Sequence, residues 1–138
     1  MVRGENMFKP TRLYIKRHSI TSKYYFGKTV RQNVKLYHGS GKHWVNHIKK
    51  YGTQFVETIW VSDWFYDQNE VTKKAYLISE FLFIVESDQW LNMIIETGIG
   101  GGDDNHMVSM RKHKTVFSNK AAVAKIKEIM KDSGGDIP

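Results

Sequence analysis

The sequence predicts an α+β domain in which a small three-stranded antiparallel sheet is flanked by helices, followed by a short basic helical extension. Three observations lead to this prediction. Residues 12–18 and 23–29 are rich in Tyr, Phe, Ile, Val and Thr, and the turn "SITSK" separates them, which predicts a hairpin. Residues 54–62, "QFVETIWVS", predict a third strand. Three other segments carry helix signals.

The first expected helix lies between Ser40, a candidate N-cap, and Gly52, a candidate C-terminal stop. Trp44, Ile48 and Tyr51 fall at helical spacing inside it. We therefore expect these three side chains to form its buried stripe.

Two further helices are expected nearer the C-terminus. One runs from about residue 70 to 86 with Asn69 as its cap, and its second half, "LISEFLFIVES", is apolar nearly all round. Such a helix is typically buried on most sides. The other covers residues 119–132, with Ser118 as its cap and Gly134 as its stop.

The chain of 138 residues is long enough for one compact domain. The glycines of "GIGGGDD" (98–104) interrupt any regular element. We place a boundary there, between a domain over residues 1–97, with its core at about 12–95, and a glycine-rich loop and basic extension over 98–138.

The net charge of +7 is unevenly distributed along the chain. Residues 1–50 contain twelve Lys or Arg and one acidic residue, residues 51–105 contain two and ten, and residues 106–138 contain seven and three. A polyanion such as nucleic acid would be drawn to the first and last thirds, and the acidic middle could hold a cation. The alternative is a basic surface that only maintains solubility.

The remaining composition excludes several classes of protein. The longest unbroken apolar run, residues 81–85, has five residues, whereas a membrane span needs about 20. No charged-then-apolar signal peptide opens the chain, so we expect a soluble cytoplasmic protein. The absence of cysteine excludes disulfides and cysteine-ligated zinc.

Glu80 is the most informative single residue. Its helical neighbours at three and four positions are Tyr76, Leu77, Phe83 and Ile84. A carboxylate on such a surface is costly to desolvate unless it is paired or binds a metal. An ion pair with a Lys or Arg is the structural alternative.

Tyr14 and Tyr25 lie on adjacent predicted strands, and Tyr24 points to the opposite face from Tyr25. These tyrosines either pack the sheet or include a phenol that orients or deprotonates a water beside a phosphate. Because a phenol has a pKa near 10, the second role needs a metal or another cation nearby.

His43 and His47 form an i,i+4 pair on one helix face. They either contact a phosphate or transfer a proton, or they are surface residues without a functional role. Two histidines alone do not make a zinc site. The preceding "YHGSGKHW" (37–44) lacks the spacing of a phosphate-binding Walker loop, so we interpret it as a turn into this helix.

Together these residues resemble the GIY-YIG nuclease family over about residues 12–95. Arg12-Leu13-Tyr14 stands where GIY would be and keeps the tyrosine, and Tyr25-Phe26-Gly27 stands where YIG would be and keeps the tyrosine and glycine. The eleven-residue separation of the two tyrosines suits the family. "YFGKT" followed by "YHGSGKHWVNHIKKYG" is similar to the version in phage-encoded homing-type endonucleases.

The resemblance implies a role for each matching residue. Tyr14 would activate or position the attacking water, and Tyr25 would support that water and the scissile phosphate. Gly27 would let the backbone turn close to the site. Glu80 would bind one Mg²⁺, with Mn²⁺ as an alternative. Asn92 falls where a site asparagine often follows the glutamate helix.

One position departs from the family pattern. The family has an arginine just before the aromatic residue that is Trp44 here, and this chain has His43, which lacks the guanidinium fork. His47 matches a position that often holds histidine. We expect the phosphate contacts to come from basic side chains of the hairpin and the following loop: Lys28, Arg31, Lys35 and Lys42.

The function implied by the resemblance is that of a Mg²⁺-dependent DNA endonuclease of phage homing type. A monomer has one centre and should nick one strand, whereas a homodimer could cut both. The basic C-terminal helix either contacts phosphates or packs on the domain. The alternatives are an inactive nucleic-acid-binding module, a phage protein that binds a host protein, and an enzyme acting on RNA.

Overall fold

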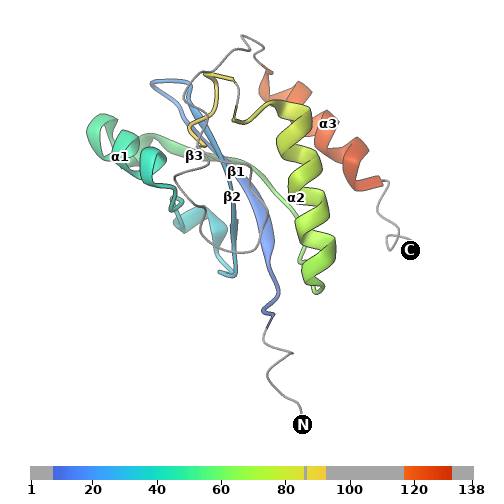
Figure 1. The fold of residues 1–138 in the computed structure, drawn as a ribbon. Coiled ribbons are helices and arrows are strands. Elements are labelled where there is room, and N and C mark those ends of the chain that lie inside the picture. The colour runs from blue at the N-terminus through green and yellow to red at the C-terminus, as the bar shows by residue number, and fades with distance from the viewer. Residues whose placement is uncertain (1–7, 86, 93–116, 132–138) are drawn as a thin grey trace.

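The computed structural model describes residues 8–85, 87–92 and 117–131, and it confirms the predicted α+β fold with a three-stranded antiparallel sheet (Figure 1). The strands and helices are β1 (Arg12–His18), β2 (Tyr24–Thr29), α1 (Lys42–Tyr51), β3 (Val56–Val61), α2 (Gln68–Leu82) and α3 (Asn119–Lys131). Short 3₁₀ turns occupy Val34–Leu36 and Thr53–Phe55.

Strand β1 is the centre of the sheet, whose order is β2-β1-β3. Tyr14 of β1 stands opposite Gly27 of β2 and Val61 of β3. The pairing with β3 shifts between Ile15 and Lys16, and such a bulge increases the local twist. Strand β1 therefore pairs on both of its edges, with β2 on one side and β3 on the other.

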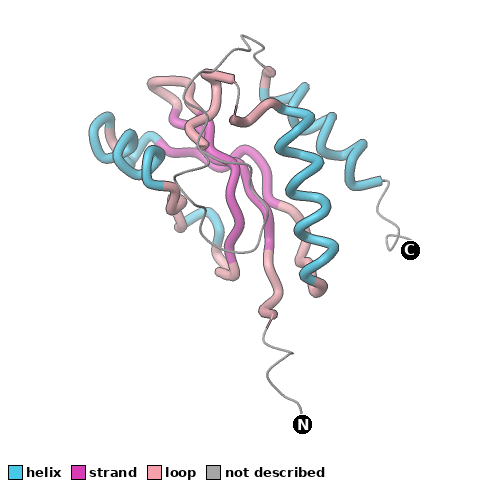
Figure 2. Tube along the Cα trace, viewed as in Figure 1, coloured by secondary structure: helices cyan, strands magenta, loops and turns pink. Residues whose placement is uncertain are grey.

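Helices cover both faces of the sheet. Figure 2 shows α1 on one side and the α2–α3 pair on the other. Successive side chains of a strand point to opposite faces, so each strand contributes to both layers. This alternation divides the buried residues into two clusters with different compositions.

The larger cluster is hydrophobic and lies between the sheet and the α2–α3 pair. The strands contribute Leu13, Ile15, Tyr24 and Phe26 to it. Residues of α2, α3 and the segment after α2 complete it: Val71, Ala75, Ile78, Leu82, Ile84, Val85, Trp90, Ala122, Ile126 and Ile129. Burial of this apolar surface is the main driving force for the fold.

The smaller cluster lies on the α1 side and is rich in aromatic residues. Its buried members are Tyr14, Tyr25, Val34, Trp44 and Ile48. Tyr24 and Tyr25 therefore belong to different clusters, as the strand alternation predicts.

Helix α1 ends where the sequence predicts, because Gly52 is its C-cap with φ 112°. The N-cap is Gly41 and not Ser40, since the helix begins at Lys42. Tyr51 is 44% exposed, so its assignment to the buried stripe was wrong.

Helix α2 is shorter than predicted. Its N-cap is Asp67, whose side chain accepts a hydrogen bond from the Glu70 amide, and not Asn69. It ends at Leu82 because Phe83 adopts the left-handed conformation, with φ 54°, and turns the chain. The expected end at residue 86 was therefore wrong.

Helix α3 belongs to the main core. The Ser118 hydroxyl accepts a hydrogen bond from the Ala121 amide, which confirms the predicted cap. The buried Lys74 of α2 donates to the Ile129 carbonyl at 2.6 Å and so ties α3 to its neighbour. The predicted boundary after residue 97 and the stop at Gly134 lie outside the described residues.

The outer edge of β2 is covered by residues 89–92. The Tyr24 amide donates to the Gln89 carbonyl, and the Leu91 amide donates to the Tyr24 carbonyl. Asn92 extends this pairing with its side chain, since Oδ1 accepts from the Phe26 amide at 3.0 Å and Nδ2 donates to the Phe26 carbonyl at 2.7 Å. A covered edge does not offer its backbone to another chain.

Within residues 8–85, 87–92 and 117–131, no helix is long and apolar enough to cross a membrane.

We predict that Asn92→Ala lowers the free energy of unfolding by about 1–3 kcal/mol, because it leaves the buried amide and carbonyl of Phe26 without this partner. Urea denaturation measures the change. The control is Asn69→Ala at an exposed position of α2, for which we expect less than about 0.5 kcal/mol. Equal stabilities for the two variants would contradict the role of Asn92.

Candidate functional site

The two sides of the central strand carry different chemistry. Leu13 and Ile15 face the hydrophobic core, whereas Tyr14, Lys16 and His18 share the α1 side. All five side chains have no exposed area. The α1 side of β1 therefore buries hydrogen-bonding groups at three alternate positions, which an aliphatic core would not require.

Tyr14 and Tyr25 lie side by side on this face with ring centres 6.2 Å apart. Gly27, opposite Tyr14 in the sheet, provides the space for both rings. A Cβ atom on Gly27 would lie 2.5 Å from the Tyr14 hydroxyl oxygen and 2.8 Å from Cε2 of Tyr25. The glycine is thus required by the close approach of the two tyrosine rings.

Helix α1 adds an aromatic stack to this pair. The Trp44 indole stacks on Tyr25 with 5.6 Å between ring centres and 12° between planes. Its Nε1 donates to the His38 carbonyl at 2.6 Å, which holds the preceding loop. A Cβ atom on Gly41 would lie 2.5 Å from the Tyr25 ring, so the helix begins in contact with the tyrosine.

His47 continues the stack one turn later. Its ring is parallel to Trp44 within 18°, and its Nε2 lies 2.7 Å from the Thr21 hydroxyl of the hairpin turn. Burial lowers the pKa of His47, and the nearby basic side chains of His18, Lys23 and Lys50 lower it further. His47 is therefore predisposed to be neutral and able to exchange a proton.

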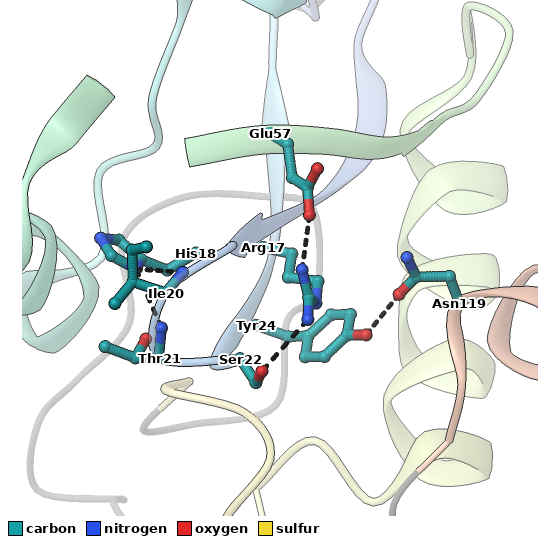
Figure 3. A network of polar contacts seen from close by, with 8 residues as sticks. All are labelled: Arg17, His18, Ile20, Thr21, Ser22, Tyr24, Glu57 and Asn119. Carbon is teal, nitrogen blue, oxygen red and sulfur yellow. Dashed lines mark hydrogen bonds and ion pairs between the residues drawn. The ribbon is translucent and has the colours of Figure 1, made fainter. Parts of the chain in front are cut away.

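His18 fixes the hairpin turn to the end of α1. Its Nδ1 accepts from the Ile20 and Thr21 amides, so the proton is on Nε2, which donates to the Gly52 carbonyl at 2.9 Å. Figure 3 shows the turn residues gathered around this ring. Both ring nitrogens are occupied by the backbone, which indicates a structural role for His18.

Figure 3 also shows how the opposite face of the hairpin is organised. Arg17 donates to Glu57 at 2.6 Å and to Ser22 at 3.1 Å, and its guanidinium lies over the Tyr24 ring. The Tyr24 hydroxyl donates to Asn119 at the start of α3. The contacts of the Tyr24 side chain with Arg17 and Asn119 therefore lie on the other face of the sheet from Tyr25 and are structural.

The loop between β2 and α1 lies against the tyrosine pair. Tyr37 packs edge-on against Tyr14 with ring centres 5.9 Å apart, and the Arg31 guanidinium lies 4.7 Å from the Tyr37 ring centre. Residues 6–56 contain no Asp or Glu. Exposed basic side chains of this stretch include Arg31, Lys35, Lys42, His43, Lys49 and Lys50.

Lys16 is a buried member of the site that the sequence interpretation missed. Its Nζ donates to the Val34 carbonyl at 2.6 Å and to the Thr58 hydroxyl at 2.7 Å, and lies 5.8 Å from the Tyr14 ring centre. Desolvation lowers the pKa of Lys16 to about 8. Strand alternation was the available signal, because it places Lys16 on the same face as Tyr14.

The structure does not place Glu80 among these residues. Glu80 is exposed on α2, whose buried side chains pack on the other face of the sheet from Tyr14 and Tyr25. The expectation that this carboxylate is buried on an apolar helix surface was wrong. The sheet and α3 cover other sides of α2 and leave Glu80 exposed to solvent.

Two other expected substrate contacts are also separated from the tyrosine pair. The Asn92 amide is buried and bonded to the Phe26 backbone. Lys28 is half-buried and, by strand alternation, shares the face of Tyr24 and Phe26. Asn92 therefore has a structural role, and Lys28 lies on the other face of the sheet from Tyr14 and Tyr25.

Glu80 is the residue to which the resemblance assigns a metal ion. In the part of the chain that the structure describes, no group of three or more His, Cys, Asp or Glu side chains could hold an ion. A single exposed carboxylate can bind a hydrated Mg²⁺, which commonly takes one or two protein carboxylates and completes its shell with water and phosphate oxygens. Glu80 does not fit a metal shared with Tyr14 and Tyr25, because it lies on the opposite layer of the sheet.

Comparisons with protein-family models, with curated proteins and with solved structures find no match for this chain. The resemblance to GIY-YIG nucleases therefore depends on the residues quoted above and stays a prediction.

We predict that Gly27→Ala destabilises the protein by about 1–3 kcal/mol, because the new methyl group overlaps the Tyr14 hydroxyl. Urea denaturation of the single variant and of Gly27→Ala/Tyr14→Phe measures the coupling. Removing the hydroxyl should recover part of the loss, although the ring carbon remains close. Strict additivity of the two single changes would contradict a contact between these residues.

The lowered pKa of His47 predicts a pH-dependent stability. The unfolded state binds the proton more tightly, so the stability present above pH about 6.5 is lost as the pH falls through the pKa of the folded state. Urea denaturation between about pH 7.5 and 5.5 should show a shallower loss in His47→Gln than in the wild type.

The matched control is His43→Gln, one turn earlier on the exposed side of α1. It should keep the pH dependence of the wild type. Indistinguishable curves for His47→Gln and the wild type would overturn the prediction.

Proposed function

We propose that this chain is a metal-dependent DNA endonuclease that binds DNA on the face formed by α1 and residues 30–41. One observation carries the proposal: Tyr14, Tyr25 and Gly27 meet on one side of the sheet, next to exposed Arg and Lys side chains in a stretch without acids. Basic and aromatic groups together are the usual footprint of nucleic-acid binding.

In this proposal the phenols act on the water and the scissile phosphate. Tyr14 positions or deprotonates the water, and Tyr25, backed by Trp44, orients the phosphate. His47, which is separated from Tyr25 by Trp44, accepts or donates a proton, while His43 and Arg31 contact the DNA backbone. Because Tyr14 has no exposed area, substrate binding must displace the half-buried Tyr37 from it.

A metal ion, Mg²⁺ or Mn²⁺, would polarise the phosphate and stabilise the leaving oxygen. The resemblance assigns this ion to Glu80, but Glu80 lies on the layer of the sheet opposite Tyr14 and Tyr25, so an ion held there would not reach a phosphate that Tyr25 orients. A monomer with one such centre would nick a single strand. An enzyme of this kind would work in the cytoplasm of a phage-infected host, where its DNA substrate is found.

The position of Glu80 favours a second candidate function. A carboxylate on the layer opposite the tyrosines, together with His43 in place of arginine, suits a module that binds nucleic acid without cutting it. Such a module would keep its salt-sensitive binding after any change at Tyr14 or Glu80.

We predict that Tyr25→Phe lowers the rate of nicking of supercoiled plasmid in Mg²⁺ by about 100-fold or more, while DNA binding is retained. The control is Tyr24→Phe, the neighbouring tyrosine whose hydroxyl bonds Asn119 on the other face. Tyr24→Phe should lose stability by about 1 kcal/mol and cut normally. Equal cleavage by both variants would exclude Tyr25 from the reaction.

EDTA should prevent nicking, whereas Glu80→Gln should nick plasmid at the wild-type rate, because Glu80 lies on the layer opposite the tyrosines. Loss of nicking in Glu80→Gln would show instead that Glu80 holds the metal. The control is Glu128→Gln, an exposed carboxylate on α3, which should cut at the wild-type rate. If the wild type itself leaves plasmid intact in both Mg²⁺ and Mn²⁺ yet binds DNA, the binding module replaces the endonuclease. If it neither cuts nor binds DNA, a protein partner becomes the better hypothesis.

A further inference from the structure

The fully buried Lys16 lies at the centre of the sheet, where lysine is uncommon. It occupies β1 between Tyr14 and His18 on the α1 side. An aliphatic side chain at this position would pack without the cost of removing an ammonium from water. A buried cation retained there points to a role for its charge.

Two hydrogen bonds fix the position of this charge. Nζ donates to the Val34 carbonyl in the loop before α1 and to the Thr58 hydroxyl on β3. An ammonium has three donors, so these contacts occupy two of them. The acceptors come from different elements, which holds Nζ in one place.

That place is beside the proposed water-activating phenol. Nζ lies 5.8 Å from the Tyr14 ring centre. A nearby positive charge favours the ionised form of an acid, and a phenol needs such help to release its proton near neutral pH. Two lysines are buried in the described residues, Lys16 and Lys74, and Lys16 is the one on the same side of the sheet as Tyr14.

We propose that Lys16 is a positioning residue for Tyr14: its fixed ammonium supplies the positive charge that favours the phenolate form of the tyrosine. The catalytic consequence of this inference rests on the proposed endonuclease function. The electrostatic link between the two side chains does not, and it can be measured without DNA.

The titration of Lys16 makes the link observable. Burial lowers its pKa to about 8, so the ammonium is present at neutral pH and is lost within the range in which the protein can be studied. Among the described residues, the titratable groups facing Tyr14 include Tyr25 from β2 and Tyr37 from the loop, with Arg31 behind Tyr37. On α1, His47 lies beyond Tyr25 and Trp44.

The test follows the tyrosine ring carbons by NMR in protein labelled with ¹³C at Cζ, with Tyr14→Phe identifying the Tyr14 signal. Between about pH 6.5 and 9.5 the wild-type signal should shift with a midpoint near the pKa of Lys16, about 8. Lys16→Met should remove that shift. An unchanged titration in Lys16→Met, or no shift in the wild type, would overturn the proposal.

The matched control is Lys74→Met. Lys74 is equally buried and donates to the Ile129 carbonyl, but on the α2–α3 side. It should keep the Tyr14 titration of the wild type. If Lys16→Met does not fold, Thr58→Val serves instead: loss of this acceptor should move the midpoint of the Tyr14 signal lower, and an unmoved midpoint would overturn the proposal.

Cleavage assays separate this inference from the proposed function. Wild-type nicking should decline above pH about 8, and Lys16→Met should cut about tenfold more slowly at pH 7 without that decline. Nicking by Lys16→Met with the wild-type rate and pH profile would overturn the role of Lys16. If no form of the protein cuts DNA, the endonuclease proposal fails while the carbon signals still decide the link to Tyr14.

Discussion

Polar groups buried on one side of the central strand constrain everything around them. Lys16 and His18 have no exposed area, so each must find its hydrogen-bond partners inside the protein. Those partners come from the 3₁₀ turn at Val34, from Thr58 of β3, from the hairpin turn and from Gly52 at the end of α1. Segments that would otherwise be free loops are thereby held against the sheet.

The two faces of the sheet consequently do different work. The cluster under α2 and α3 is almost entirely apolar and contains most of the buried hydrophobic residues of the described chain. The cluster under α1 is rich in aromatic rings, and the polar atoms of Trp44 and of the neighbouring His47 bond to His38 and Thr21 in the adjoining loops. Substitutions on the first face should act mainly on stability, whereas those on the second can change chemistry while the fold persists.

Local signals in the sequence predicted the elements well where one residue decides the outcome. Gly52 ends α1 and Ser118 caps α3 as expected, because each acts through its own backbone or side chain. The end of α2 depends on a left-handed Phe83, which no local pattern signals. The exposure of Glu80 depends on which sides of α2 are covered, and Lys16 was passed over because lysine is rarely buried.

The covered edge of β2 has a consequence for the order in which the chain folds. Asn92 and Phe26 are 66 residues apart, so their pairing closes a long loop, whereas the β1–β2 hairpin closes a short one. The hairpin can form early, but its outer edge stays open until α2 has docked and delivered residues 89–92. During synthesis the protein therefore passes through a period in which β2 is an unprotected strand, and this exposure ends when residues 89–92 dock on it.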